Sequence, residues 1–326
     1  MRGVWVGLCL VAVGCDGRAV SLDSAVPAAD GVWRLDRLPP PDGPPDRGVL
    51  PASQRDLVIS RLVLPGPATA AKLGHDYNND GTIDNALGSI LGALTSITGN
   101  MDLQQAMDAA VNQGSALVLL RLQATSFDND PAASARAWLA APEVCCTVPQ
   151  SPTQCAAQAK ASCFSGTHAF QPDPADPQGS LLGGPILNGK LDFGPGSMKL
   201  PLLFAGSGLT LDLTAARIEG TIVGQTITNG VLSGAVEQAQ LKSTLIPTLA
   251  KMLDSTVKDP SADPAVKDVI QTLFDSNHDG GISASEVLNS TIIKTFLGGD
   301  VDVDNDGVME LTLGLGFEAV PAVISP

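Results

Sequence analysis

Segments with the alternation of β-strands lie at both ends of the chain and in its middle. Residues 57–64 are rich in Val, Ile and Leu, residues 116–124 alternate apolar with polar side chains, and residues 311–317 place Leu and Phe on one face. The stretch 182–238 is β-like and punctuated by glycine, with Asn-Gly and Ser-Gly pairs typical of tight turns. A sheet built from these segments has to collect strands from the whole chain, so we predict one α+β domain over residues 56–326.

The predicted sheet is antiparallel, sandwich or barrel-like, and carries helical insertions. Helical composition or periodicity marks the segments 84–97, 102–112, 132–140, 241–253, 265–274 and 284–297. We expect Pro247 to kink or restart the helix that contains it, because proline has no backbone N–H to donate. In the strand region the alternation slips at Ala215 and Ala216, which predicts a β-bulge.

The composition is acidic and poor in aromatic residues. Among 326 residues, 34 Asp and Glu stand against 19 Lys and Arg, a formal net charge of -15. An acidic surface does not neutralise phosphates, so we predict no nucleic-acid partner and no polybasic contact with anionic lipid. Hydrophobic residues make up 44% and aromatic residues 4%, which predicts a sizeable aliphatic core.

Three His and one Tyr leave little material for acid–base chemistry, and none of the common catalytic motifs occurs, so we predict that the chain is not an enzyme.

The first 15 residues have the pattern of a secretory signal peptide. A positive charge is followed by an apolar segment, residues 4–13, and by small residues that end at Cys15. Residues 12–15 resemble the lipobox of bacterial lipoproteins, which implies that Cys15 is lipidated and becomes the mature N-terminus. Residues 16–55 are rich in Pro, Asp and Gly without an apolar period, which predicts an extended tether. We therefore expect an exported protein of the bacterial cell envelope, anchored in the lipid bilayer by an acyl chain; an ordinary cleaved signal is the alternative.

Four cysteines cluster near the middle of the chain: Cys145, Cys146, Cys155 and Cys163. An even number of cysteines in an exported chain indicates disulfides, and the spacing lacks the CxxC pairs of zinc sites. Adjacent cysteines rarely bridge each other. Two pairings are therefore expected: Cys145–Cys155 with Cys146–Cys163, or Cys145–Cys163 with Cys146–Cys155. Either pairing would staple a loop rich in Pro and Ala.

The strongest functional signal is the run 275–286, named here the second acidic loop. Counting Asp275 as position 1, oxygen donors fall at positions 1, 3, 5, 7, 9 and 12, with Gly280 at position 6 and Ile282 at position 8. Calcium prefers such sets of six to eight oxygens. The predicted ligands are Asp275, Asn277, Asp279, the Gly281 carbonyl, Ser283 through water, and bidentate Glu286. All twelve residues, with predicted helices on both sides over 264–298, resemble the calcium-binding loop of the EF-hand family. The resemblance implies that Ile282 forms a short β-bridge with a partner loop.

Two further loops repeat the first nine positions of this pattern. The first acidic loop is residues 76–84 and the third acidic loop is residues 302–310; both have Gly at position 6 but Leu at position 12, so the bidentate acid of a full EF-hand is missing. Crowded carboxylates repel one another unless a cation lies among them. The predicted calcium ligands are Asp76, Asn78, Asp80, Thr82 and Asp84 in the first loop and Asp302, Asp304, Asp306, Val308 and Glu310 in the third. A plain Asn/Asp-Gly turn is the alternative for each.

These features together predict an exported, lipid-anchored calcium-binding protein in which calcium is mainly structural. The chain as a whole resembles secreted bacterial lipoproteins with acidic EF-hand-like loops, and this resemblance implies no activity. Two alternatives stay open: a calcium-shaped binding module for a lipid, glycan or protein partner of the envelope, and a metal-dependent hydrolase. An apolar pocket left empty by the protein's own side chains would favour the first. A metal with an open coordination position beside a second carboxylate pair would favour the second.

Overall fold

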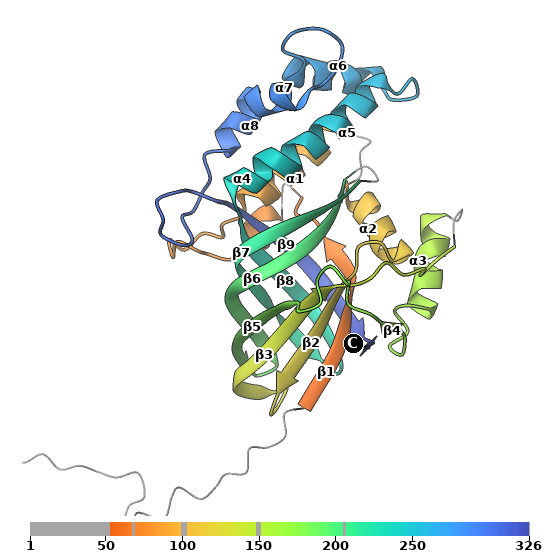
Figure 1. The fold of residues 1–326 in the computed structure, drawn as a ribbon, viewed down its shortest axis with the longest axis vertical. Coiled ribbons are helices and arrows are strands. Elements are labelled where there is room, and N and C mark those ends of the chain that lie inside the picture. Colours follow the sequence, from red (N-terminus) through yellow and green to blue (C-terminus); the bar gives the residue numbers. More distant parts are fainter. Residues whose placement is uncertain (1–52, 67–68, 99–102, 148–150, 205–206, 326) are drawn as a thin grey trace, which may run out of the picture. The chain divides into compact units, whose positions relative to one another are not determined.

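Eight strands of the described residues form one antiparallel sheet that closes on itself as a barrel (Figure 1). Their order around the barrel is β1, β2, β3, β5, β6, β7, β8, β9, and β9 pairs with β1 to complete it. The strands are β1 Ser53–Val63, β2 Val118–Ala124, β3 Asn129–Leu139, β5 Ser180–Leu187, β6 Lys190–Phe204, β7 Ser207–Val223, β8 Thr226–Val236 and β9 Leu311–Pro321. The predicted α+β class with an antiparallel sheet is confirmed, and of the two predicted sheet forms the chain adopts the barrel.

The structure, a computed structural model, describes residues 53–66, 69–98, 103–147, 151–204 and 207–325. The predicted signal segment, Cys15 and the tether up to residue 52 lie outside the described residues. The barrel and the described helices belong to one compact unit, Pro51–Pro326. Two short strands, β4 (Ala169–Phe170) and β10 (Val323–Ile324), form a separate parallel pair.

The long hairpin of β6 and β7 shows how the sequence pattern builds the barrel wall. Leu200 pairs with Leu211, and both are buried, whereas the neighbouring pair of Lys199 and Asp212 faces outward. Alternation of this kind places every second side chain in the core. At Ala215 the backbone has a φ of 47° and the register between β7 and β8 shifts, so the predicted bulge is confirmed.

Strand β9 is buried on both faces, although its alternation predicted one polar face. Thr312, Gly314 and Gly316 are buried like the leucines between them. At Gly314 a Cβ atom would lie 2.5 Å from the Cα of Gly74, so only glycine admits this close approach. The chain just before helix α1 (Ala86–Thr98) therefore lies directly on the outside of β9.

Most helices cover one end of the barrel (Figure 1). Their bounds, after α1, are α2 Leu103–Gln113, α3 Pro152–Ala161, α4 Gln238–Gln240, α5 Ile246–Lys258, α6 Pro264–Phe274, α7 Ala284–Asn289 and α8 Thr291–Phe296, with a 3₁₀ turn η1 at Ala70–Lys72 and a π-helical turn η2 at Leu241–Leu245. Pro247 stands in the first turn of α5, directly after η2, as the expected restart requires. Among the described residues, no helix combines the length and apolar character needed to cross a membrane.

Two helix predictions are wrong. Residues 132–140 lie mostly in strand β3, where Ala133, Ala135 and Ala137 are buried in alternation, because packing in the barrel overrides the helix preference of alanine. Residues 284–297 form two helices instead of one. The break falls at Ser290, which ends α7 and whose hydroxyl accepts the Ile293 N–H at 3.3 Å to cap α8.

The cysteines form the second of the two expected pairings, Cys145–Cys163 and Cys146–Cys155. Disulfides form and persist in oxidising compartments, so these two bridges indicate an exported protein. The stapled segment is not only a loop, because it contains α3. Ser151 begins this helix with a capping box in which its hydroxyl accepts the Gln154 N–H and the Gln154 side chain contacts the Ser151 N–H. This helix was not predicted, although Ser151, Pro152 and Gln154 form a recognisable signal for a helix start.

Candidate metal centre

The three acidic loops share one backbone conformation. Position 4 of each has a positive φ, 58° at Asn79, 56° at His278 and 61° at Asn305. The position-6 glycines also lie in the left-handed region, with φ of 87°, 81° and 88° in chain order. Asn and Gly adopt this conformation more readily than other residues. Three segments far apart in the sequence therefore make the same tight turn.

The first aspartate of each loop closes this turn. Asp76, Asp275 and Asp302 each accept two backbone N–H groups, from position 5 at 3.1 Å and from the position-6 glycine at 2.9–3.0 Å. The position-5 aspartates in turn accept the N–H of position 7, at 2.7–2.8 Å. Thr82, Gly281 and Val308 at position 7 are predicted metal ligands. Their backbone is thus held in place by the position-5 aspartates, which are predicted ligands too.

A last acidic side chain folds back over each loop, but its position differs. In the second loop it is Glu286 at position 12, which accepts the Asn277 N–H at 3.4 Å. In the first loop Asp84, at position 9, accepts the Tyr77 N–H at 2.7 Å, and in the third Glu310, also at position 9, accepts the Val303 N–H at 3.0 Å. The acid missing at position 12 of the shorter loops is therefore replaced by one at position 9.

Isolated β-bridges bring the position-9 acids into place. Asp84 pairs with His75, and Glu310 pairs with Val301, so each acid lies opposite the residue that directly precedes its loop. The leucines at position 12, Leu87 and Leu313, are core residues. Sequence comparison with a twelve-residue loop did not reveal this shorter closure, which depends on pairing across the loop.

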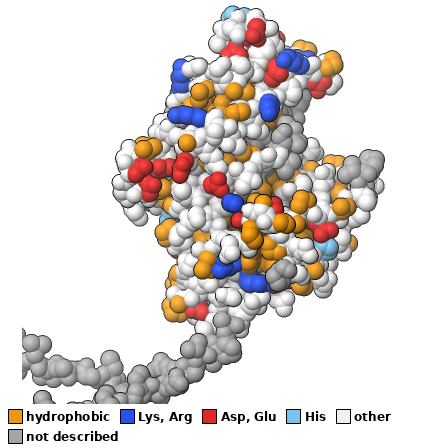
Figure 2. All heavy atoms as spheres, in the orientation of Figure 1, with side chains coloured by type: hydrophobic (Ala, Val, Ile, Leu, Met, Phe, Trp, Pro, Cys, Tyr) orange, Lys and Arg blue, Asp and Glu red, His pale blue; other side chains and the backbone are white. Residues whose placement is uncertain are grey.

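The third acidic loop has the closest set of carboxylates. Ligand oxygens of Asp302, Asp304 and Glu310 all lie within 4.8 Å of one another. Glu310 is only 4% exposed. Burial and the neighbouring charges of Asp304, Asp302 and Asp306 raise the pKa of Glu310. This acidic cluster could hold a metal ion, and its donors are all oxygens. Figure 2 shows acidic side chains gathered on this side of the molecule, beside the helical end of the barrel.

Among the described residues, no Lys, Arg or His forms an ion pair with a carboxylate of any of the three loops. Lys258 lies beside the second loop but pairs with Asp254 of α5. Asp275 and Glu286 of the second loop are nevertheless buried, as is Glu310 of the third. A buried carboxylate is costly unless a charge or hydrogen bonds compensate it. The hydrogen-bond sets described above compensate in part, and a cation would complete them.

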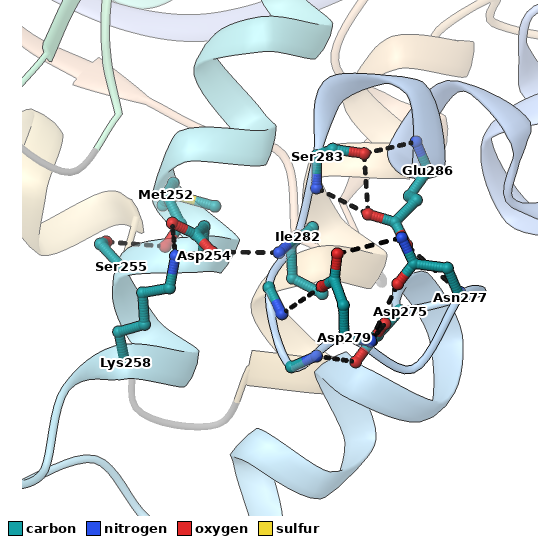
Figure 3. A network of polar contacts seen from close by, with 12 residues as sticks. Met252, Asp254, Ser255, Lys258, Asp275, Asn277, Asp279, Ile282, Ser283 and Glu286 are labelled. Atoms are coloured by element: carbon teal, nitrogen blue, oxygen red, sulfur yellow. Dashed lines mark hydrogen bonds and ion pairs between the residues drawn. The ribbon is translucent and has the colours of Figure 1, made fainter.

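The second acidic loop lies between α6 and α7 (Figure 3). The Ser283 hydroxyl and N–H both donate to Glu286, at 2.7 and 2.9 Å, and these bonds lower the pKa of Glu286. The predicted β-bridge of Ile282 is absent from the described part of the chain. Its N–H instead donates to Asp254 of α5 at 3.0 Å, and Asp254 also pairs with Lys258. A side chain thus takes the place of a partner loop.

The first acidic loop rests on the outside of the barrel wall. The Tyr77 hydroxyl donates to Ser233 on β8 and to the carbonyl of Ala215 in the β7 bulge, at 3.1 and 3.3 Å. Burial raises the pKa of Tyr77 to about 12, so the phenol stays protonated. His75 Nδ1 lies 2.9 Å from Glu219 of β7. These contacts attach the loop to the sheet.

Asn85 connects the first loop to β9 and was not predicted from the sequence. Its side chain is buried and hydrogen-bonds the N–H and the carbonyl of Gly314, at 2.8 and 3.1 Å. The same amide contacts the carbonyls of Ala70 and Leu73 and the N–H of Gly88. A single side chain therefore satisfies backbone groups from three segments.

An apolar cavity of about 30 Å³ lies beneath the helices, among Leu91, Leu245, Leu249, Ile293 and Leu311. One water molecule needs roughly 10–15 Å³ on this measure, so the cavity has room for a water or two and not for an acyl chain.

Comparison with known proteins adds no assignment: no family model, no curated protein and no solved structure matches this chain. The chemistry of the three acidic loops is therefore the basis on which a function is assigned.

Proposed function

We propose that this protein is an exported calcium-binding protein, anchored by an acyl chain at Cys15, in which calcium has a mainly structural role. The observation that carries the proposal is the common geometry of the three acidic loops. Each turns its predicted ligands inward around one aspartate and closes with a further acid. In this proposal α6, the second loop and α7 form an EF-hand-like unit.

Calcium fits the donor sets better than other common metals do. The predicted ligands are carboxylates, amide and backbone carbonyls and a hydroxyl, which are hard oxygen donors. Zinc prefers Cys and His ligands, and neither stands at a predicted ligand position. Magnesium requires near-ideal octahedral geometry and keeps several waters, whereas calcium tolerates irregular loops of this kind.

A structural role follows from where the loops are attached. The first loop leads into α1, the third leads into β9, and the second joins α6 to α7. Without a cation the carboxylates of each loop repel one another at these junctions, and with a cation the same groups hold the junction together. The small size of the apolar cavity favours this role over a module that encloses a lipid chain.

Export and anchoring rest on separate support. The two disulfides fit an oxidising compartment outside the cytoplasm. The lipobox-like residues 12–15 support acylation of Cys15, and the Pro-rich residues 16–55 support a tether between the anchor and the barrel. The proposed location is the bacterial cell envelope.

Replacing Glu286 tests the second loop. Glu286→Gln keeps the side-chain size but removes the charge and one strong ligand oxygen, so the calcium affinity of this site should fall at least tenfold, equivalent to about 1.4 kcal/mol. Isothermal titration calorimetry of the metal-free full chain measures the change. The matched control is Glu318→Gln, an exposed glutamate on β9 outside the loops, which should leave all calcium affinities unchanged. Equal affinities for Glu286→Gln and the unmodified chain would contradict the assignment.

The loops should also differ in how acid releases their calcium. Burial raises the pKa of Glu310 and of Asp84, so protons compete with calcium there at higher pH than at Glu286, whose pKa is lowered by Ser283. Between pH 7 and pH 5, Glu286→Gln, which retains the first and third loops, should therefore lose calcium affinity more steeply than the double variant Asp84→Asn/Glu310→Gln. Calcium titrations at the two pH values provide the comparison, and equal losses would count against it.

A further inference from the structure

We propose that the first and third acidic loops bind calcium cooperatively, because the segments that follow them are joined at Thr312. This inference rests on the proposed calcium function and adds how two of the sites communicate. The second loop has no part in the junction, because it lies among α5, α6 and α7.

Thr312 links the exit of the first loop to the entry of the third. It is the second residue of β9, two residues after Glu310, and it is fully buried. Its hydroxyl accepts the N–H of Ala86 at 3.1 Å, and Ala86 follows Asp84 by two residues. The Thr312 N–H donates to Asp300 at 2.9 Å, and its hydroxyl donates to the other oxygen of the same carboxylate. The hydroxyl therefore accepts a hydrogen bond from the first-loop side and donates one to the third-loop side.

A second link lies two residues further along β9, at Gly314. Gly314 exchanges two hydrogen bonds with the side chain of Asn85, the residue between Asp84 and Ala86. In Figure 1 the segment that precedes α1 and the segment that precedes β9 lie on the same side of the barrel, in agreement with these bonds. The residues immediately after the two loops thus form one hydrogen-bonded unit.

The bridge that closes the third loop continues this unit. The Asp300 N–H donates to the Glu310 carbonyl at 2.9 Å, and the Glu310 N–H donates to the Val301 carbonyl at 2.8 Å. When calcium draws the Glu310 side chain over the loop, it also fixes this bridge, and with it the carboxylate of Asp300 that holds Thr312. Thr312 then presents its hydroxyl to Ala86, next to the acid that closes the first loop.

The expected sign of the coupling is positive. One ion orders the shared unit, so the second ion binds to a loop whose exit is already ordered and meets a smaller entropic penalty. Repulsion between the ions opposes this effect, but each loop carries at least three carboxylates and stays negative around one divalent ion.

The single tyrosine of the chain makes the first loop observable by itself. Tyr77 occupies position 2 of this loop, and the sequence contains no other tyrosine. Tb³⁺ replaces Ca²⁺ at oxygen sites and luminesces when a nearby tyrosine is excited. The three tryptophans of the chain also sensitise Tb³⁺, so the part of the luminescence that Tyr77→Phe removes is the signal that reports occupancy of the first loop.

Two variants that leave the first loop intact should weaken its affinity. Asp302→Asn/Asp304→Asn disables the third loop, and Thr312→Val keeps both loops but breaks the junction. Each should raise the Tb³⁺ concentration at half-saturation of the Tyr77 signal by about fivefold, the lower end of typical coupling between sites. Thr228→Val on β8 is the matched control and should leave the titration unchanged. By reciprocity, Asp76→Asn/Asp80→Asn should weaken calcium binding at the third loop by the same factor in calorimetry.

The outcomes separate the coupling from the calcium function itself. A Tyr77 signal whose half-saturation is the same in the unmodified chain and in Asp302→Asn/Asp304→Asn would overturn the coupling and leave calcium binding in place. No Tyr77 signal and no calorimetric heat would overturn both. Circular dichroism of each variant confirms folding, and the exposed or half-exposed Asp302 and Asp304 provide a test that does not depend on replacing the buried Thr312.

Discussion

Saturating calcium should raise the melting temperature of the metal-free protein by about 5–10 °C for each occupied loop. A ligand that binds only the folded state at a hundredfold excess over its dissociation constant adds roughly 2.7 kcal/mol to the free energy of unfolding. In a chain of this size, each kcal/mol corresponds to about 2–4 °C. The physical reason is the same at every loop: calcium neutralises carboxylates that otherwise repel one another at the start of α1, α7 and β9. Thermal unfolding followed by circular dichroism, in calcium and in chelator, measures the shift.

Two controls make this shift specific. Magnesium at the same concentration should produce a much smaller change, because it dehydrates reluctantly and demands octahedral geometry. Asp302→Asn/Asp304→Asn should shrink the calcium effect and raise the melting temperature in chelator, because it removes two charges beside Glu310. Equal melting temperatures in calcium and in chelator would leave the three loops as plain turns.

Asn85→Ala should be the most destabilising single substitution outside the apolar core, lowering the free energy of unfolding by about 3 kcal/mol or more. The alanine leaves backbone groups of Gly314, Gly88 and Ala70 buried without their partner, and each unsatisfied buried group costs about 1–3 kcal/mol. It also frees the exit of the first loop from β9. Urea denaturation monitored by the fluorescence of the buried Trp138 gives the difference.

The matched control for this substitution is Asn289→Ala. Asn289 is exposed at the end of α7, and its side chain donates to the Ser285 carbonyl at 2.8 Å. Its loss should change the free energy of unfolding by less than about 0.5 kcal/mol, as for most surface substitutions. Similar losses for the two alanine variants would show that Asn85 does not anchor the loop to the barrel.

The strands could be predicted from the sequence because their alternation is local. Residues 57–63, 118–124 and 311–317 of the predicted segments lie in strands, whereas Leu64, Ala116 and Leu117 fall just outside them, and the slip at Ala215 is a bulge. Barrel closure is not local, because it depends on β9 pairing with both β1 and β8. The same holds for the second buried face of β9, which exists only because the chain before α1 covers it.

The three acidic loops were recognised from their residue types, whereas their contacts with the rest of the fold were not. The predicted first aspartates, position-5 aspartates and closing acids all turn toward their own loops. Asp84 and Glu310 were predicted as ligands, but the β-bridges at His75 and Val301 that place them over their loops were not. The roles of Asn85, Asp254 and Thr312 were not predicted for a similar reason. Each side chain forms its hydrogen bond with a segment that is distant in the sequence.

Calcium calorimetry of the metal-free full chain shows whether the three acidic loops are calcium sites. We expect saturable binding at three sites, with dissociation constants in the range typical of extracellular calcium modules, roughly 10⁻⁴–10⁻³ M, or tighter. Glu286→Gln should weaken one of these sites, and Asp302→Asn/Asp304→Asn should remove another. If the unmodified, folded chain shows no saturable calcium binding up to about ten times that range, the loops are not calcium sites.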